Sequence, residues 1–299
     1  MRTAIRIRQA IMSKSSKQLK CGKFRLTLGE GVLVMGVLNV TPDSFSDGGR
    51  YLDVGKAVAR AKSMEKDGAD IIDIGGESTR PGARKVPARE ELRRVLPVIG
   101  ALSSRLRIPI SIDTYKSQVA REAIDAGAVM VNDITALRGD EKMTSIVAES
   151  GVPAVLMHMR GTSGTMQRNP HYQNVMGEIC SFLKKRSEFA TRSGIDAGQI
   201  IIDPGIGFGK RLEDNIEIIR SLGKIKKIGY PVLVGPSRKS FIGTLLGLPS
   251  DERLEGTLAA VTACVLNGAD IVRVHDVKEV ARAVKVSQAI LGNRRSGNR

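Results

Sequence analysis

Residues 68–81 of the chain, GADIIDIGGESTRP, pass from a glycine through a short apolar run to a polar turn. The run Ala69–Ile74 is nearly continuous in apolar residues rather than alternating. Continuous apolarity over so short a run is typical of a strand buried on both faces, as in a parallel sheet covered by helices. The glycine suits the left-handed turn that ends a preceding helix. The stretch therefore predicts one βα unit of an α/β protein.

Comparable runs recur along the chain, and amphipathic segments with helical spacing separate them. The eight runs are Val32–Leu38, Ala69–Ile74, Ile108–Ile112, Ala128–Val131, Pro153–Met157, Gln199–Ile202, Pro231–Val234 and Asp270–Val274. Strands that alternate with helices predict a parallel sheet, and eight such units in 299 residues predict closure. We therefore expect an α/β fold, a single (β/α)8 TIM barrel. A doubly wound open sheet is disfavoured because the first run lacks the glycine spacing of a dinucleotide-binding turn.

No Pro/Gly/Ser-rich linker divides the chain, which predicts one folded domain. Phe24–Gly31 alternates before the first run and is expected to form a short N-terminal hairpin that plugs the bottom of the barrel. We assign residues 1–23 to a basic N-terminal extension, residues 24–291 to the barrel domain and residues 292–299 to a basic C-terminal tail.

The net charge of +16 raises the question of a nucleic-acid partner. Residues 1–29 contain eight Lys or Arg and no acid, and residues 280–299 contain five more and no acid. The two ends thus supply 13 of the 16 charges, and the body of the barrel is nearly balanced. These ends show no interleaving of aromatic with basic residues for base stacking, so solvated basic tails are favoured over nucleic-acid binding.

Three well-separated cysteines, Cys21, Cys180 and Cys264, form neither a metal-ligand spacing nor a disulfide framework. Their small, odd number favours a reducing compartment, and we expect a cytoplasmic protein. No apolar run approaches the length of about 18 residues that a membrane span needs, so no membrane partner is expected.

Polar side chains stand at the C-terminal ends of the predicted strands. They are Asn39, the turn 75–81, Asp113, Asn132, Asp133, His158, Asp203, Ser237, Arg238, Lys239, Arg273, His275 and Asp276. In a βα barrel these ends meet at one mouth, where the chemistry takes place. The carboxylates and the amide suit the edge of a heterocycle with ring N–H, amino and carbonyl groups. The cationic or potentially cationic groups, with Arg80, suit a phosphate or diphosphate.

Each of these residues also has a purely structural explanation. Asp113 or Asp203 alone could cap the helix that follows it. His158 lies between two methionines and is more typical of a packed histidine than of a ligand, and the sparse histidines disfavour a zinc site. The convergence of many polar strand ends, rather than any single residue, therefore indicates a functional site.

In their order along the chain, these strand ends resemble the dihydropteroate synthase family of folate biosynthesis. The matching segments are residues 36–49 (GVLNVTPDSFSDGG), 73–82 (DIGGESTRPG), 111–114 (SIDT), 132–133 (ND), 157–159 (MHM), 203–210 (DPGIGFGK), 237–240 (SRKS) and 273–276 (RVHD). The resemblance covers almost the whole chain, from about residue 34 to residue 277.

The resemblance implies a transferase that condenses 6-hydroxymethyl-7,8-dihydropterin diphosphate with p-aminobenzoate and releases pyrophosphate. It implies that the pterin diphosphate is held by Asp113, Asn132, Met157, Asp203, Lys239, Arg273 and His275. Asn39 would bind the diphosphate and Mg²⁺, and the p-aminobenzoate pocket would contain Thr79, Arg80, Pro81, Phe208, Ser240 and Lys239. It also implies that the loops after the first two strands close over the site, that sulfonamides target it, and that the protein is a homodimer through its late helices.

This chemistry is consistent with the residue types. A carbon beside an electron-rich pterin can support positive charge as the diphosphate leaves, which predicts an SN1-like displacement with Asp113, Asp203 and Lys239 as the catalytic groups. Two alternatives remain open: a pterin-dependent methyltransferase domain, and a non-catalytic protein whose tails bind nucleic acid. The cationic strand ends favour the synthase, because a diphosphate leaving group needs them and a methyl carrier does not.

Overall fold

A computed structural model describes residues 17–41, 53–78, 82–83 and 85–292. Eight parallel strands run in the order β8-β7-β6-β5-β4-β3-β10-β9. They are β3 (Leu33–Asn39), β4 (Ile71–Gly75), β5 (Ile110–Asp113), β6 (Met130–Asp133), β7 (Ala154–Met157), β8 (Ile200–Asp203), β9 (Leu233–Val234) and β10 (Ile271–Val274). A parallel bridge between Ile202 and Val232 joins the two outer strands of this order. The sheet thus closes, and the predicted barrel is confirmed.

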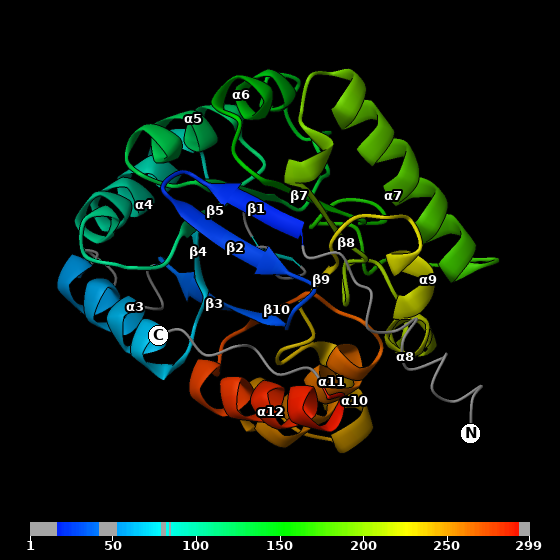
Figure 1. Cartoon of the computed structure of the whole chain (residues 1–299). Coiled ribbons are helices and arrows are strands. Elements are labelled where there is room, and N and C mark those ends of the chain that lie inside the picture. Colours follow the sequence, from blue (N-terminus) through cyan, green and yellow to red (C-terminus); the bar gives the residue numbers. More distant parts are fainter. Residues whose placement is uncertain (1–16, 42–52, 79–81, 84, 293–299) are drawn as a thin grey trace.

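Helices surround the strands on all sides (Figure 1). They are α3 (Val54–Asp67), α4 (Ala88–Ser103), α5 (Ser117–Asp125), α6 (Met143–Ser150), α7 (Val175–Arg192), α8 (Leu212–Arg220), α9 (Leu222–Lys226), α10 (Ser240–Leu246), α11 (Leu254–Leu266) and α12 (Val277–Ile290), with short 3-10 turns η1 (Ala197–Gln199) and η2 (Ser250–Glu252). Their apolar faces pack on the outside of the sheet, so the strands are buried on both faces, as their continuous apolarity predicted. Within the described residues, no helix is both long and apolar enough to cross a membrane.

The repeated Gly-Ala-Asp turns lie at the bottom of the barrel and are structural. Gly68 and Gly268 have φ angles of 108° and 102°, which only glycine adopts without strain. The aspartate two residues later then reaches a neighbouring strand. Asp70 Oδ2 accepts from the Val34 N–H at 2.8 Å, and Asp270 Oδ2 accepts from the Val232 N–H at 2.8 Å. Each turn therefore fixes the start of one strand against the next.

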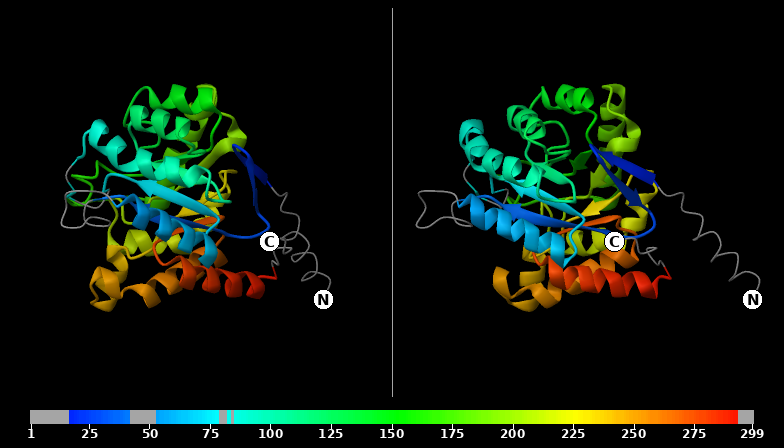
Figure 2. Two further views of the ribbon diagram at one scale, coloured as in Figure 1. Left: turned by 90° about the vertical axis from the view of Figure 1, so that its left-hand side faces the viewer. Right: turned by 60° about the vertical axis from the view of Figure 1, so that its left-hand side comes forward.

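An antiparallel hairpin of β1 (Lys17–Cys21) and β2 (Phe24–Leu28) lies across the bottom of the barrel (Figures 1 and 2). Leu19, Cys21 and Leu28 pack against the lowest inward-facing side chains of the barrel strands. The hairpin begins earlier than the sequence suggested, because Lys17–Cys21 falls in the segment assigned to the basic extension. Its lysines conceal a short alternation in which only the apolar side chains are buried.

Candidate active site

A cavity of about 400 Å³ lies at the C-terminal ends of the strands, opposite the hairpin. Ten of the residues predicted for the site line it: Asn39, Asp113, Asn132, Met157, Asp203, Phe208, Lys239, Ser240, Arg273 and His275. Thr79, Arg80 and Pro81 lie outside the described residues, although the preceding Ser78 lines the same cavity. The structure therefore brings together the polar strand ends whose convergence was expected.

Arg273 extends from β10 across the mouth of the barrel to two carboxylates. Its Nε donates to Asp73 Oδ2 at 2.6 Å, and its Nη2 donates to Asp113 Oδ2 at 2.6 Å. Burial by itself would lower the pKa of Arg273, but the two carboxylates raise it well above its ordinary value. The guanidinium is thus permanently charged and held in one orientation at the centre of the site.

Asp73, on β4, is a site residue that the sequence argument missed. It is completely buried, and its Oδ2 also accepts from Asn132 Nδ2 at 2.9 Å. One carboxylate oxygen therefore fixes both Arg273 and Asn132. The period of two along a strand could have found it, since Ile71 packs at the bottom of the barrel interior and Asp73 must face the same way.

Asp113 and Asp203, the two acids that line the cavity, are poorly solvated. Burial raises the pKa of Asp113 to about 7, with Arg273 opposing the rise and Asp73 adding to it. Burial likewise raises the pKa of Asp203 to about 6, opposed by the Gly205 N–H that donates to its Oδ1 at 2.6 Å. N–H groups of a ligand would stabilise the ionised form of both carboxyl groups, because such donors replace the water that burial removes.

Lys239 and His275 line the same cavity. Lys239 Nζ is 4.0 Å from the centroid of the Phe208 ring, within the range of a cation–π contact. His275 Nδ1 is 3.0 Å from Ser237 Oγ. Burial and then the neighbouring cations, Arg273 first among them, lower the pKa of His275 to about 3. His275 is therefore neutral near pH 7 and can serve an anion as a hydrogen-bond donor rather than as a charge.

Arg238 and Arg253 also line the cavity. Arg238 belongs to a predicted strand end but was given no role in the site, and Arg253 was not predicted. Arg238 has a φ of 56°, an uncommon conformation for a residue other than glycine, and its side chain pairs with Asp276. Arg253 Nη1 donates to the Arg238 carbonyl at 3.1 Å. Arg253 lies at the start of a helix, so its position in the site depends on tertiary packing and carries no strand-end signal.

The loop after β8 contains glycines, whose lack of a side chain would let a flat ligand approach the main chain closely. Gly207 lines the cavity, and the structure also gives these glycines a packing reason. A Cβ on Gly205 would lie 2.1 Å from the His158 carbonyl oxygen, and one on Gly207 would lie 3.0 Å from Lys239 Cδ. These glycines therefore let the loop pack against the end of β7 and against the stem of the cavity lysine.

His158 does not line the cavity, as its position between methionines suggested. Its ring meets the Phe182 ring edge-on at 4.9 Å, and burial followed by the charge of Lys210 lowers its pKa to about 2. His158 is thus a neutral packed histidine.

The family described as pterin binding enzyme matches residues 35–275 of the chain. Dihydropteroate synthase of Bacillus subtilis (strain 168) is 51% identical over 266 residues, which cover 89% of this chain and 91% of the relative. The chain belongs to the dihydropteroate synthase family.

Solved structures of family members are similar over the same extent. Xanthomonas albilineans dihydropteroate synthase with 4-aminobenzoic acid is 46% identical, with a TM-score of 0.87, and the match covers 93% of this chain and 99% of that one. The same organism's enzyme in complex with 7,8-dihydropteroate is 43% identical, with a TM-score of 0.83, and the match covers 92% of this chain and 98% of that one.

In the present chain, Lys116 forms ion pairs with Glu77 and Glu91 beside the cavity, and Tyr115 donates to Glu77 Oε1 at 3.1 Å. These contacts fix the chain leaving β4 just before Ser78.

Proposed function

We propose that the protein condenses 6-hydroxymethyl-7,8-dihydropterin diphosphate with p-aminobenzoate to give 7,8-dihydropteroate and pyrophosphate. The observation that carries this proposal is the division of one cavity into two neighbouring sets of groups. Asp113, Asn132 and Asp203 offer acceptors and an amide, whereas Lys239 and Arg273 offer cations. A heterocycle joined to a diphosphate needs both sets in one cavity, and family membership names the heterocycle.

The pterin would lie against the acidic set. Asp113 and Asp203 would accept from its ring N–H and amino groups, and Asn132, held by Asp73, would donate to or accept from its edge. Met157 is buried beside these groups and would pack on the ring. The guanidinium of Arg273, fixed by its two carboxylates, would offer a flat cation for stacking.

The reaction would proceed by an SN1-like displacement. The bond between the pterin methylene carbon and the diphosphate oxygen breaks, and both electrons leave with pyrophosphate. The positive charge that develops on the methylene is shared with the electron-rich pterin and is favoured by the ionised Asp113 and Asp203. The amine nitrogen of p-aminobenzoate then forms the new bond and loses a proton. Lys239, Arg273 and the N–H of His275 would stabilise the departing anion.

Mg²⁺ fits this site as an ion that accompanies the diphosphate. Asn39 lines the cavity at the end of β3, and its amide oxygen is a suitable ligand. The described residues form no cluster of three or more His, Cys, Asp or Glu that could hold a metal by themselves. Mg²⁺ commonly binds through few protein groups together with substrate phosphates and water, and it would help neutralise the leaving group.

The p-aminobenzoate would bind beside Phe208, Ser240 and Lys239, with Thr79, Arg80 and Pro81 completing the pocket. Phe208 and Ser240 line the same cavity as the acidic set, so the amine can face the pterin methylene.

The homodimer expected from the family would form through α10, α11 and α12. Large apolar side chains are exposed on these helices or just after them: Leu245, Leu246, Leu266, Val286, Ile290 and Leu291. Val286 (60% exposed) and Ile290 (74% exposed) are four residues apart on α12 and so share one face of the helix, which would bury them at an interface. We also place the protein in the cytoplasm, because its three cysteines are free thiols.

A coupled assay for pyrophosphate tests the function. Release should require both p-aminobenzoate and the pterin diphosphate, and 7,8-dihydropteroate should accumulate in equal amount. No release with both substrates and Mg²⁺ present would refute the proposal, and release without p-aminobenzoate would indicate a hydrolase instead.

A further inference from the structure

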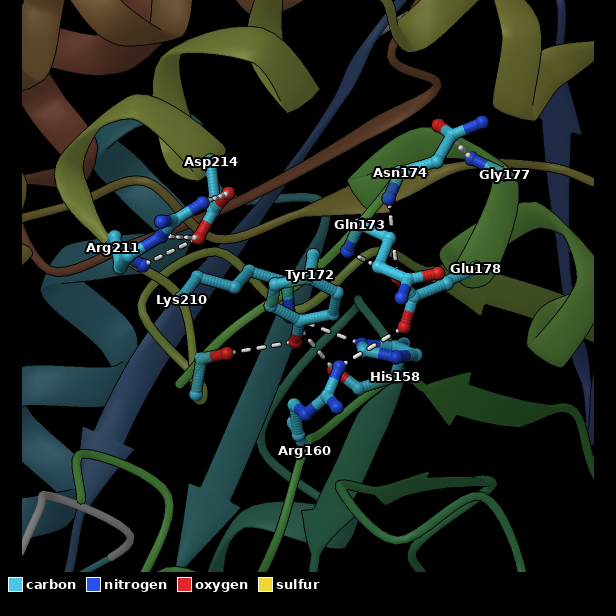
Figure 3. A network of polar contacts seen from close by, with 11 residues as sticks. His158, Arg160, Tyr172, Gln173, Asn174, Gly177, Glu178, Lys210, Arg211 and Asp214 are labelled. Atoms are coloured by element: carbon cyan, nitrogen blue, oxygen red, sulfur yellow. Dashed lines mark hydrogen bonds and ion pairs between the residues drawn. The ribbon is translucent and has the colours of Figure 1, made fainter. Parts of the chain in front are cut away.

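A buried lysine, Lys210, lies where two loops at the cavity meet (Figure 3). The β7 loop is residues 158–173 and the β8 loop is residues 204–211. Lys210 is only 3% exposed, and its Nζ lies 3.1 Å from His158 Nδ1, 3.2 Å from the His158 carbonyl oxygen and 3.0 Å from the Phe208 carbonyl oxygen. One amine therefore contacts the main chain of both loops.

Three successive carbonyls of the β8 loop each accept a hydrogen bond from a side chain. Gln167 donates to Gly207 at 2.8 Å, Lys210 to Phe208 at 3.0 Å and Tyr172 to Gly209 at 2.7 Å. Two of these donors belong to the β7 loop, and the third, Lys210, also binds the first residue of that loop. The middle carbonyl belongs to Phe208, whose ring lines the cavity and contacts Lys239 Nζ.

The contacts of Lys210 match an ammonium group. An ammonium has three hydrogens, and the site offers three acceptors: two carbonyl oxygens and a ring nitrogen. His158 can accept because it is neutral. Burial lowers the pKa of Lys210 to about 7, and Asp203 opposes the fall. A buried charge is costly unless its hydrogen bonds are satisfied, so such a group is suited to fixing one arrangement of the surrounding backbone.

We propose that Lys210 is a positioning residue, which holds the β8 loop against the β7 loop so that the Phe208 ring stands correctly on the arylamine side of the cavity. It touches neither substrate and acts through the Phe208 main chain. The proposal rests on the proposed function for the identity of the arylamine, whereas the junction of the two loops stands on the geometry alone.

Steady-state kinetics of the full chain test the functional half. Lys210→Met keeps the apolar stem and removes all three donors. We expect the KM for p-aminobenzoate to rise about tenfold, the loss typical of a charge-assisted hydrogen bond, with kcat and the KM for the pterin diphosphate changed less than about threefold. Arg211→Ala is the matched control, because the side chain of the adjacent Arg211 pairs with Asp214 on α8 (Figure 3) rather than with the β7 loop, and the variant should leave all three constants unchanged. An unchanged KM for p-aminobenzoate, or an equal loss in all constants, would overturn positioning.

Hydrogen exchange tests the junction without reference to catalysis. Lys210→Met should speed amide exchange in both loops, and Arg211→Ala should not. Unchanged exchange would overturn the proposal even in an active protein, whereas an inactive wild type with the expected exchange would refute only the proposed function. Should Lys210→Met fail to fold, Tyr172→Phe removes the single bond to Gly209 and should raise the KM for p-aminobenzoate about threefold. An unchanged KM for p-aminobenzoate in that variant would overturn the proposal that the junction of the two loops positions Phe208.

Discussion

Asp73→Asn isolates the carboxylate that fixes the centre of the site. The substitution keeps the shape of the side chain and removes its charge. One oxygen can still accept from Arg273 or Asn132, and the amide nitrogen takes the place of Oδ1, which has no hydrogen-bond partner among the described residues. The variant therefore tests charge and orientation rather than the filling of space.

The expected loss follows from the contacts of Arg273. Removing one partner of a buried ion pair costs about 3–5 kcal/mol. Arg273 keeps Asp113 as a second partner, so we expect the lower end, about 3 kcal/mol in the free energy of unfolding. For a domain of this size that corresponds to a fall in Tm of roughly 6–12 °C. The loosened guanidinium should also raise the KM for the pterin diphosphate by on the order of tenfold.

Thermal unfolding and the pyrophosphate assay measure the two effects in one preparation. Glu149→Gln is the control, because it removes an exposed ion pair with Arg121 that contributes at most about 1 kcal/mol. If Asp73→Asn has the Tm and KM of the control, the carboxylate does not position Arg273 and the reasoning is wrong. A lower Tm with normal KM would confine Asp73 to stability.

Three further results are expected. Because the raised pKa of Asp113 keeps its carboxyl protonated below about pH 7, kcat/KM for the pterin diphosphate should rise with pH and level off above 7, and Asp113→Asn should show lower activity with the rise moved to about pH 6, where Asp203 titrates. Replacing Val286 and Ile290 with lysine should convert a dimer to monomers in light scattering, and a wild-type monomer would contradict the proposed interface. Deleting residues 1–16 should leave activity intact, whereas deletion through Leu28 exposes the bottom of the barrel and should cost about 5 kcal/mol of unfolding free energy for three buried apolar side chains, visible as a loss of Tm.

The sequence predicted the barrel well because its strands carry a local signal. Runs such as Leu33–Leu38 are apolar on both faces, and the glycine before several runs, such as Gly68 and Gly268, marks a helix end that needs a positive φ. The hairpin was predicted less accurately, since five residues that include two lysines give too short an alternation to separate from a basic tail.

The site residues, too, could be predicted from the sequence only where they carry a local signal. Residues at strand ends, such as Asp113 and Arg273, could be predicted because closure of the barrel brings all strand ends to one mouth. Residues within a strand or far from a strand end could not be recognised in this way, and Asp73 and Arg253 are the clearest cases. Their roles come from what they contact. Asp73 accepts hydrogen bonds from Arg273 and Asn132, which join strands that are up to 200 residues apart in the chain.

The missed residues have one function in common, because each is a charged group that holds another residue of the cavity in place. Asp73 holds Arg273 and Asn132, Arg253 holds the carbonyl of Arg238, and Lys210 holds the carbonyl of Phe208. A displacement that develops charge on a carbon and on a leaving group depends on donors and acceptors that are already oriented, because reorienting them during the reaction would offset their stabilising effect. These supporting charges are therefore as much a requirement of the chemistry as the groups that face the substrates.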